Sequence, residues 1–389
     1  MKVLQRLDDG LALPDHERML LASVRRLATD KIQARAARYD ESGEFPWENV
    51  EDINRLELNK MFIPERYGGA ELSYRVYLAC CRELSAACAA TGIIWATNFH
   101  AATPIIGFAT DAQKQRWLTR LAAGALAALA LTEPDAGSDA TAMTTTFRED
   151  GDSIVINGAK IFITNGDVAD LLVVFGKWAE LGDGKNAISI AILEKGTPGF
   201  EVVRVENKMG IRASSTAALA FDNCRIPRGH LLGAPGEGLR MLFGFLNKSR
   251  PSVAAHALGI ARAAFEDSVA YVNQRSQFGR RIVENQAIQF MLADHATDLA
   301  LCERWLWHVA ERIEAGATDI AAEASMLKLR ASDIAMRITT DAVQLMGGYG
   351  YTRDFRAERL MRDAKITQIW EGTNQIHRQA IAREFLHKR

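Results

Sequence analysis

The sequence predicts an α+β fold of three consecutive domains: an N-terminal α-helical domain, a middle antiparallel β-domain and a C-terminal antiparallel four-helix bundle. Three observations support this prediction. Helix-forming residues dominate the first third of the 389 residues, two-residue alternation marks the middle, and long apolar stripes with helical spacing fill the end. We place the domains at residues 1–125, 126–235 and 236–389, in line with the two or three domains usual for this length.

The N-terminal domain is expected to be helical because residues 15–125 are rich in Ala, Leu, Arg and Glu and show few strand-like alternations. The segments SGEFPW at 42–47 and IPERYGGAEL at 63–72 contain the Pro and Gly residues that interrupt helices. We therefore expect several helices that break at these two segments.

The middle domain is expected to be a sheet because residues 153–175 are rich in β-branched side chains and contain the pairs Asn157-Gly158 and Asn165-Gly166. Asn-Gly between apolar runs favours a hairpin turn, since both residues tolerate positive φ. Alternation at 188–192 and 217–221 places apolar residues on one face, which is typical of half-buried antiparallel strands. The segment GAPGEG at 233–238 then supplies a linker to the last domain.

The C-terminal domain is expected to be a helix bundle because apolar residues recur at alternating spacings of four and three. Three such stripes run from Val253 to Ala264, from Ile288 to Ile313 and from Ile320 to Ile338. This spacing keeps one seam on one side of each helix, and successive helices of this kind favour an antiparallel bundle. A lone histidine in the second stripe, His295, indicates a core residue rather than a ligand.

Composition argues against several kinds of partner. The formal net charge of -1 and the pI of about 6.7 do not suggest nucleic acid. The longest apolar run, at 124–132, is too short to span a bilayer, so no membrane association is expected. Residues 1–21 resemble neither a secretory signal nor a transit peptide, which favours a cytoplasmic protein.

Common catalytic motifs are also missing from the sequence. The five cysteines and eight histidines show no metal-ligand spacing, so no metal site is expected. No Rossmann glycine fingerprint follows a strand, and neither a P-loop nor a GxSxG nucleophile elbow is present. A Rossmann oxidoreductase, an NTPase and an α/β-hydrolase are therefore poorly supported.

Four short segments carry residue types suited to chemistry, although each has a structural explanation when taken alone. LTEPDAGSDA at 131–140 is a polar loop whose small residues would expose backbone N–H groups to an anionic ligand. RSQFGRR at 275–281 follows a helix, where arginine suits the dipole, and GGYGY at 347–351 predicts a helix C-cap. QIWEGTNQIHR at 368–378 places an acid, Glu371, beside Trp370 at a break between two predicted helices.

Taken in order, five segments show a resemblance to a known family: LTEPDAGSD, KIFITNG, RSQFGRRIVENQA, DAVQLMGGYGY and MRDAKITQIWEGTNQIHR. The chain resembles the acyl-CoA dehydrogenase family over nearly its whole length. The resemblance implies an oxidoreductase that holds FAD without a Rossmann fold, in a cleft between the β-domain and the bundle. It also implies an acyl-CoA substrate, electron-transferring flavoprotein as electron acceptor, and a homotetramer arranged as a dimer of dimers.

The resemblance implies which residues hold FAD. Leu131 and Thr132 would bond the flavin edge, and Phe162 and Thr164 would lie against the ring, although the family commonly has Trp where Phe162 stands. A phenyl ring still packs on a flavin face, so we expect altered contacts and not lost binding. The other implied FAD contacts are Gly137 and Ser138 near the pyrophosphate, Thr373 and Gln375, and, partly from a neighbouring subunit, Arg275, Gln277, Phe278, Gln286, Gln344, Gly347 and Gly348.

The resemblance implies that Glu371 is the catalytic base, which takes the α-proton while the β-hydride goes to flavin N5. A carboxylate suits this step only when desolvation raises its pKa, and Trp370 beside it would supply a dry setting. The backbone N–H of Glu371 would polarise the thioester carbonyl together with an FAD ribityl hydroxyl. A minority of the family carries the base where this chain has Ser249, which is no acid.

Other residues are implied to contact the substrate. Arg250 matches the active-site arginine of the family, and Asn247 lies in the same substrate-lining segment. Ser138 would also reach the CoA moiety, and Arg383 matches a CoA-contacting position. Together with Glu371 and its backbone N–H, these residues complete the expected substrate site.

The acyl group and the electron acceptor stay open at the level of sequence. The bulky Trp95, Phe99 and Trp370 favour a pocket for short- or medium/branched-chain acyl groups, although each also suits simple packing. The same fold also serves dehydrogenases of carrier-protein-bound acyl groups, oxidases that use O₂, and non-catalytic relatives that act as binding modules. The intact Glu371 and the FAD motifs argue against the last of these.

Overall fold

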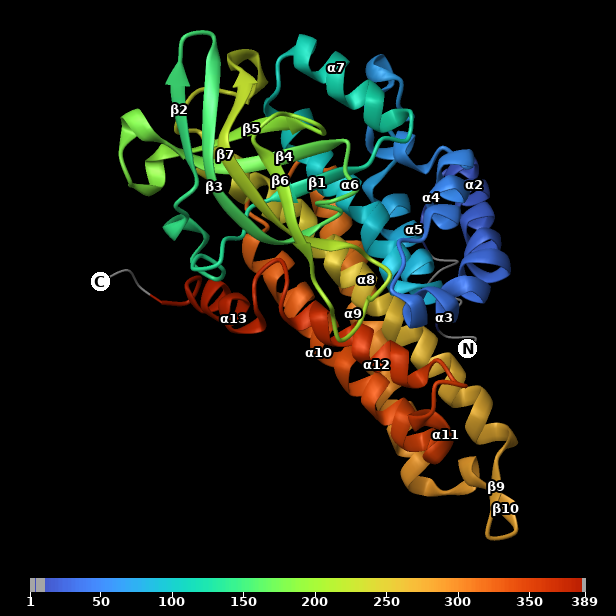
Figure 1. The fold of residues 1–389 in the computed structure, drawn as a ribbon. Helices are drawn as coiled ribbons and strands as arrows, with labels where there is room; N and C mark the ends of the chain where they lie inside the picture. Colours follow the sequence, from blue (N-terminus) through green and yellow to red (C-terminus); the bar gives the residue numbers. More distant parts are fainter. Residues whose placement is uncertain (1–3, 5–10, 387–389) are drawn as a thin grey trace.

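The computed structural model describes Leu4 and residues 11–386 of the chain, and it shows three parts in sequence order (Figure 1). Helices form one side, a twisted sheet lies beside them, and a long bundle extends away from both. The last N-terminal helix ends at Ala122 and the first strand begins at Ala127. The last strand ends at Leu232 and the first bundle helix begins at Gly238. The predicted fold class is confirmed.

The N-terminal part is helical, and helices stop at both predicted segments. The chain leaves α3 at Ser42 through Gly43, whose φ is 71°, and residues 68–73 form an extended connection between two helices. The elements are α2 (Asp15–Leu27), the π-helical η1 (Ala28–Ile32), α3 (Gln33–Ser42), α4 (Trp47–Arg55), η2 (Leu58–Phe62), η3 (Glu65–Tyr67), α5 (Tyr74–Ala87), α6 (Ala89–Phe108) and α7 (Asp111–Ala122).

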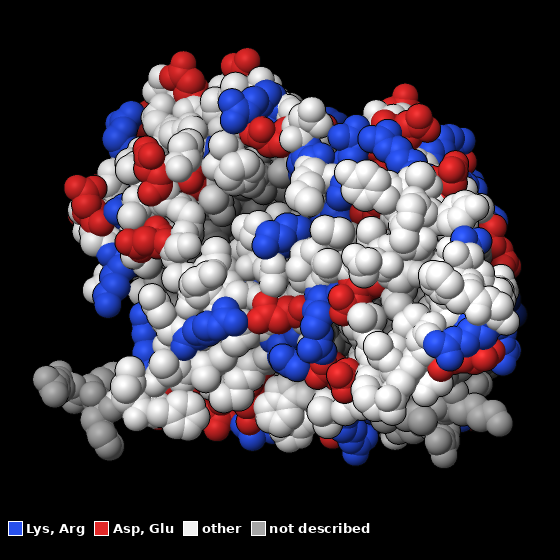
Figure 2. Space-filling model, turned by 90° about the horizontal axis from the view of Figure 1, so that it is seen from below, with Lys and Arg blue, Asp and Glu red and all other residues white. Residues whose placement is uncertain are grey.

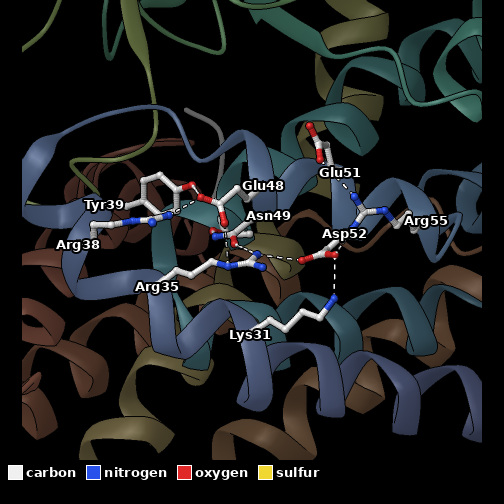
Figure 3. A network of polar contacts seen from close by, with 10 residues as sticks. Lys31, Arg35, Arg38, Tyr39, Glu48, Asn49, Glu51, Asp52 and Arg55 are labelled. Atoms are coloured by element: carbon white, nitrogen blue, oxygen red, sulfur yellow. Dashed lines mark hydrogen bonds and ion pairs between the residues drawn. The ribbon is translucent and has the colours of Figure 1, made fainter.

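A polar network fastens α4 to the preceding helices (Figure 3). Its centre is the buried carboxylate of Asp52, which accepts hydrogen bonds from Lys31 Nζ at 3.0 Å, Arg35 Nη1 at 2.8 Å and Arg55 Nη1 at 2.6 Å. Burial alone raises the pKa of Asp52, but the neighbouring cations outweigh it and the pKa falls below its ordinary value. The network therefore holds a charged group inside this helical part.

The middle part is an eight-stranded sheet with the order β6-β7-β3-β2-β4-β5-β8, in which β1 also pairs with β4. Most neighbours are antiparallel, as expected, but β4 runs parallel to both β1 and β2. The strands are β1 (Ala127–Ala130), β2 (Thr146–Asp150), β3 (Ser153–Thr164), β4 (Leu171–Trp178), β5 (Ile188–Glu194), β6 (Phe200–Val205), β7 (Thr216–Pro227) and β8 (Leu231–Leu232).

The predicted Asn-Gly hairpins are wrong. Asn157-Gly158 lies inside β3, where the register with β7 shifts at Gly158 and forms a bulge. Gly158 has φ +144°, and a Cβ there would lie 2.5 Å from Thr145 Oγ1, so the position needs glycine. Asn165 has φ 61° and turns the chain after β3, but the next strand pairs with β2 instead of β3. The observed hairpin joins β2 to β3 through Gly151.

Half-burial is correct for one of the two alternating segments. In β7 the side chains of 217, 219 and 221 are buried, whereas Ala218 and Ala220 are partly exposed. In β5 both faces are buried, which corrects the prediction for 188–192. Its three isoleucines pack in a core with α6, α7 and α8, and Ala191 and Leu193 pack in the core on the other side of the sheet. Period two alone does not reveal a sheet covered on both faces.

The C-terminal part contains three long helices, and the shorter α12 packs against α8 and α10 as the fourth. The predicted stripes are buried along their middle, and only Ile288, Leu292 and Ile313 near the ends of the second stripe are partly exposed. The elements are α8 (Gly238–Gln274), β9 (Ser276–Gln277), β10 (Arg280–Arg281), η8 (Ile282–Glu284), α9 (Gln286–Glu314), α10 (Ala321–Met346), α11 (Gly348–Tyr351), α12 (Ala357–Lys365), η9 (Ile366–Gln368) and α13 (Asn374–Ala382).

A loop of the sheet domain rests on the bundle. Ile211 N donates to Asp363 Oδ1 at 2.5 Å, and Arg362 Nη1 donates to the Met209 carbonyl at 3.0 Å. A Cβ on Gly210 would lie 2.3 Å from the Arg362 carbonyl oxygen, so the two backbones touch. This contact fixes where the sheet stands relative to α12 and to the segment that follows it.

The surface seen along the bundle from below carries interspersed acidic and basic side chains with uncharged areas between them (Figure 2). It lacks the continuous basic face expected of a nucleic-acid-binding protein. Among the helices of the described chain, none combines the length and apolar character needed to cross a bilayer.

We expect Gly259→Ala to destabilise the protein and Gly244→Ala, in the same helix, to leave it as stable or slightly more stable. A Cβ at 259 would lie 2.3 Å from the Arg82 carbonyl oxygen of α5, so the helices must separate, at a cost of about 1–3 kcal/mol. At the exposed position 244 nothing lies closer than 3.7 Å, and alanine gains up to about 1 kcal/mol of helix propensity. Urea unfolding checks both, and equal midpoints for the two variants would contradict the close helix contact.

Candidate functional site

A buried ion pair holds the 131–140 loop on the sheet. Lys160 of β3 is 1% exposed, and its Nζ donates to Glu133 Oε1 at 2.8 Å and to the Leu131 carbonyl at 2.9 Å. Glu133 also accepts the Thr144 N–H and hydroxyl at 2.6 and 2.9 Å and the Thr145 N–H at 3.0 Å. Both charged groups of the pair therefore have hydrogen-bond partners inside the protein.

Opposing effects set the pKa values of this pair. Burial alone raises the pKa of Glu133, but the Lys160 charge and the donated hydrogen bonds outweigh it and hold the pKa at about 2. Burial lowers the pKa of Lys160 to about 8, against the pull of Glu133 in the other direction. Both groups are charged at neutral pH, and the loop is fixed to β3 by their attraction.

Phe162 and Thr164 stand beside this loop at the end of β3. The register with β7 shifts between Lys160 and Ile163, and Phe162 takes φ 60° there with 62% of its side chain exposed. The adjacent Ile161 N–H donates to the Thr132 carbonyl at 2.9 Å, which ties the strand to the loop. A bulge with strained backbone thus presents an apolar ring to solvent at this edge of the sheet.

Glu371 stands on a left-handed turn between η9 and α13. Its φ is 52° and that of Gly372 is 96°, so the chain reverses its direction there. Ser249 of α8 donates its hydroxyl to Glu371 Oε2 at 2.7 Å. Burial raises the pKa of Glu371, and Ser249, Arg250 and Lys328 offset part of this effect. The result is a half-buried carboxylate with a raised pKa, which is bonded to α8 and influenced by charges on α8 and α10.

Arg250 lies next to Ser249 on α8 and is buried, with one donor left over. Its Nη1 donates to Ser325 Oγ of α10 at 3.2 Å, and its Nε has no partner within the described chain. Burial lowers the pKa of Arg250, while Glu371 raises it. An arginine keeps its charge in such surroundings, so this buried N–H remains available to an anionic or polar ligand.

The indole of Trp370, next to Glu371 in the chain, packs against α8. Its ring lies edge-on to His256 with 5.3 Å between the ring centroids, and its Nε1 has no partner within the described residues. Trp95 and Phe99 are buried in an aromatic group with Phe62, Tyr74 and Tyr77, in which Tyr77 and Phe99 stack at 4.1 Å. Large rings therefore occupy the space between α5, α6 and the Glu371 turn.

The remaining predicted contacts lie in two groups. Ser138 and Gly137 are exposed on the 131–140 loop, Gln375 is exposed on α13, and Thr373 accepts the Ile376 N–H as the N-cap of α13. Asn247 is half-buried one turn before Arg250, and Arg383 is exposed at the end of α13. These residues surround the Glu371 turn or the sheet edge within one chain.

The second group lies at the far tip of the bundle (Figure 1). A cavity of about 510 Å³ there is lined by Arg275, Gln277, Gln344, Gly347 and Gly348. Phe278 projects from the turn between β9 and β10 with φ 51°, and Gln286 is exposed at the start of α9. Because Arg250 lies within α8 and Arg275 directly follows its last residue, the two are separated by about 37 Å. One chain alone does not bring the two groups together around one ligand.

Both groups have the chemistry that FAD needs. A Cβ on Gly347 or Gly348 would meet nothing within 4 Å, so backbone is open to a diphosphate. Arg275 pairs with no carboxylate among the described residues, and its guanidinium lies over Tyr349 at 5.6 Å. At the other group, the exposed Phe162 ring and the Thr132 loop suit a flat ring with polar edges.

Two site residues were not predicted from the sequence. Ser249 was noted only for not being an acid, yet its hydroxyl bonds Glu371. Lys328 follows Leu327 of the third stripe and is completely buried, with Nζ 2.6 Å from the Gly372 carbonyl. A lysine adjacent to an apolar seam was the available signal, because lysine is seldom fully buried without a partner.

Comparison with known families covers nearly the whole chain. Residues 14–125 match the family model for the acyl-CoA dehydrogenase N-terminal domain, residues 128–224 the middle domain, and residues 236–386 the C-terminal domain. The resemblance that the five motifs indicated is therefore confirmed.

Individual proteins agree with the family models. The chain is 42% identical over 370 residues to the acyl-CoA dehydrogenase of Bacillus subtilis (strain 168), covering 95% of this chain and 97% of the relative. It is 39% identical over 373 residues to the short-chain specific acyl-CoA dehydrogenase of Clostridium acetobutylicum, covering 95% and 98%.

Solved structures share the fold. Butyryl-CoA dehydrogenase from Megasphaera elsdenii matches with TM-score 0.94 and 36% identity, over 97% of this chain and all of that chain. A chain of the structure described as the electron transferring flavoprotein of Acidaminococcus fermentans matches with TM-score 0.94 and 41% identity, over 97% and 100%. A glutaryl-CoA dehydrogenase from Mycobacterium smegmatis in complex with FADH2 matches with TM-score 0.90 and 29% identity, over 99% and 96%.

We expect Lys160→Met to lower the free energy of unfolding by about 3–5 kcal/mol, because it leaves the Glu133 carboxylate buried without its cation. Adding Glu133→Gln in the same chain should restore much of the loss, since no buried charge then remains. Urea unfolding of the FAD-free protein measures this double-mutant cycle. Additive effects of the two changes would show that the pair does not couple.

Proposed function

Because this chain belongs to the acyl-CoA dehydrogenase family, we propose that it dehydrogenates a short- or medium/branched-chain acyl-CoA to the trans-2-enoyl-CoA, with Glu371 as the base. The observation that carries the proposal is the Glu371 carboxylate itself, which is held by Ser249 beside two buried cations and has a raised pKa. A base for a weakly acidic α-proton needs such a pKa.

In the proposed step, the acyl group loses a proton from Cα and a hydride from Cβ. The Cα–H bond of the acyl group breaks and its proton goes to the Glu371 carboxylate, while the electron pair of that bond forms the Cα–Cβ double bond. When bound, FAD supplies the two-electron acceptor and takes the hydride that leaves Cβ at its N5. Glu371 ends the step protonated, in a site where the neutral form is favoured by burial.

Ser249 and Arg250 have separate roles in this proposal. The Ser249 hydroxyl occupies Oε2 of Glu371 and thereby leaves Oε1 for the substrate proton. Arg250 is fixed by Ser325 and carries a permanent charge close to the place where negative charge develops on the thioester. The backbone N–H of Glu371 is the proposed donor to the thioester carbonyl.

FAD, the cofactor of this family and of the FADH2-bound relative, fits both groups of residues described above. The loop at 131–140 with Phe162 and Thr164 would hold the ring, and Thr373 and Gln375 would bound it on the bundle side. The cavity of Arg275, Gln344 and Gly347 would hold the diphosphate end of FAD bound to a second copy. This division supports an oligomer, and a dimer of dimers is the proposed assembly.

The aromatic rings support a short or compact acyl group. Trp95 and Phe99 of α6 are buried against Tyr77 of α5, and these rings would limit the depth of an acyl pocket that opens from the Glu371 turn. The similar proteins include a short-chain specific enzyme and a butyryl-CoA dehydrogenase. Electron-transferring flavoprotein is the proposed electron acceptor, supported by the similar chain found in a structure of that protein.

We expect Glu371→Gln to bind FAD and to lose reduction by substrate, because the amide keeps the shape of the side chain but accepts no proton. The loss should be about 10²- to 10⁴-fold. Anaerobic bleaching of the flavin band with a panel of straight, branched and aromatic acyl-CoAs measures it and ranks the substrates. A colourless wild-type protein that takes up no FAD would overturn the proposed function, and full activity in the variant would overturn the base assignment.

We also expect Ser249→Ala to move the acid limb of the reduction rate to higher pH. The hydroxyl lowers the pKa of Glu371, so its loss raises that pKa, and the carboxylate needed as base then forms only at higher pH. The shift should be about one pH unit. Ser268→Ala, which removes a buried hydroxyl bonded within the same helix to the Ala264 carbonyl, serves as control. An unchanged limb in Ser249→Ala would refute the role of the hydroxyl.

A further inference from the structure

Lys328 is an uncommon residue in this bundle, because its side chain is completely buried on α10. Its Nζ donates to the Gly372 carbonyl at 2.6 Å and to Asn374 Oδ1 at 3.2 Å. Both partners belong to the segment that carries Glu371 and then enters α13. The buried Lys328 ammonium group therefore makes both of these hydrogen bonds to the turn that follows Glu371.

The backbone of that turn needs an external support. Glu371 takes φ 52°, which is unfavourable for a residue with a side chain, and Gly372 follows with φ 96°. A Cβ on Gly372 would lie 3.2 Å from His377 Nε2, so the turn also packs tightly on α13. Strained positions persist only where neighbouring groups determine them.

One face of α10 supplies this support. Ser332 and Asp333, about one turn beyond Lys328, accept from Asn374 Nδ2 at 2.9 and 2.8 Å. Ser325, one turn before, accepts from Arg250 at 3.2 Å. From this face of α10, the Lys328 ammonium reaches the Gly372 carbonyl, a backbone atom adjacent to Glu371; on the other side of Glu371, the Trp370 N–H donates to the Ile366 carbonyl at 3.1 Å.

We propose that Lys328 is a positioning residue for Glu371: it holds the Gly372 carbonyl and the Asn374 side chain, and so fixes the left-handed turn that presents the carboxylate. The inference rests on the proposed function, in which Glu371 is the base. In this role Lys328 acts through the Gly372 backbone and through its charge.

The charged surroundings give this role a signature in pH. Lys328 of α10, Arg250 of α8 and Tyr77 of α5 face Glu371. Asp333 of α10 and His377 of α13 face Lys328. Burial lowers the pKa of Lys328 to about 7, against the pull of Glu371, and burial lowers that of His377 to about 3. The positive form of Lys328 lowers the pKa of Glu371. Removing that charge should therefore raise the pKa of Glu371 and delay formation of the carboxylate as pH rises.

The test compares Lys328→Met, Lys328→Arg and Lys328→Gln with Arg330→Met, which removes a half-exposed cation from the same helix. Hydrogen–deuterium exchange of the full-length protein measures protection of the amides of residues 366–376 without any substrate. Anaerobic flavin reduction across pH, with the acyl-CoA that reduces the wild-type enzyme fastest, measures the acid limb. Lys328→Gln retains a neutral donor and supplies both readouts should the methionine variant not fold.

We expect Lys328→Met to lose protection in this segment, to reduce its flavin about tenfold more slowly at neutral pH, and to show an acid limb about one pH unit higher. Lys328→Arg should restore the limb, because it keeps the charge, whereas Arg330→Met should match wild type. The inference would be overturned if Lys328→Met and Lys328→Gln both kept wild-type amide protection at residues 366–376 and a wild-type acid limb of flavin reduction. Full activity of Glu371→Gln would refute the base assignment instead, and exchange would still decide whether Lys328 holds the turn.

Discussion

Withdrawing a carboxylate from water is the physical constraint on which the rest of this site depends. The pKa of Glu371, the proposed base, is raised because protein replaces part of its hydration. A buried charge without partners costs several kcal/mol, so the surrounding helices must return some of the lost interactions. Ser249 donates a hydrogen bond to the Glu371 carboxylate, and Arg250 and Lys328 stabilise it with positive charge from two different helices. The packing of α8 against α10 is therefore a requirement of the chemistry as well as of the core.

The same constraint explains why the polar groups near Glu371 are bonded to one another. Arg250 is fixed by Ser325, and Lys328 is fixed by Gly372 and Asn374. Each of these bonds satisfies a buried group and also removes freedom from a residue next to the carboxylate. In the sheet, the pair of Glu133 and Lys160 does the same for the loop expected to meet the flavin. Two buried lysines thus fix the two segments that would face the flavin in the proposed site.

The sequence predicts the helical parts well because their signal is local. A 4-3 stripe such as that from Ile320 to Ile338 records burial of one helix face directly, and that burial is observed. The sheet is predicted less well, since Asn157-Gly158 suits a bulge and a hairpin equally, and only long-range pairing with β7 decides between them. For β5, the helices that cover the second face come from other parts of the chain. No local pattern contains that information.

The candidate site divides in a similar way. The position of Glu371 at a helix break followed from residues 368–378 alone, whereas Lys328 becomes part of the site only because α10 packs behind a turn 43 residues later in the chain. A hydrogen bond between segments so far apart leaves no spacing to recognise. The motif resemblance implies FAD contacts both near Glu371 and near Arg275. One chain holds these two groups of residues far apart.

That separation is the basis of the proposed assembly, in which residues of two chains complete each cofactor site. Arg250 lies within α8 and Arg275 just beyond its end, so the base and the diphosphate cavity are held apart by a rigid rod of about 37 Å. No bending of one chain closes such a distance, because three long helices pack along it.

The tip of the bundle also presents apolar surface: Phe278 is fully exposed on its hairpin turn, and Phe290 and Tyr351 are more than half exposed nearby. Isolated exposed rings are ordinary, but these three lie at the end of the bundle that carries the glycine-lined cavity, where the proposed second copy would bind. A second copy with its sheet edge at this tip would cover the rings and complete the cofactor site in one contact. The length of α8 would then set the distance between two active sites in the assembly.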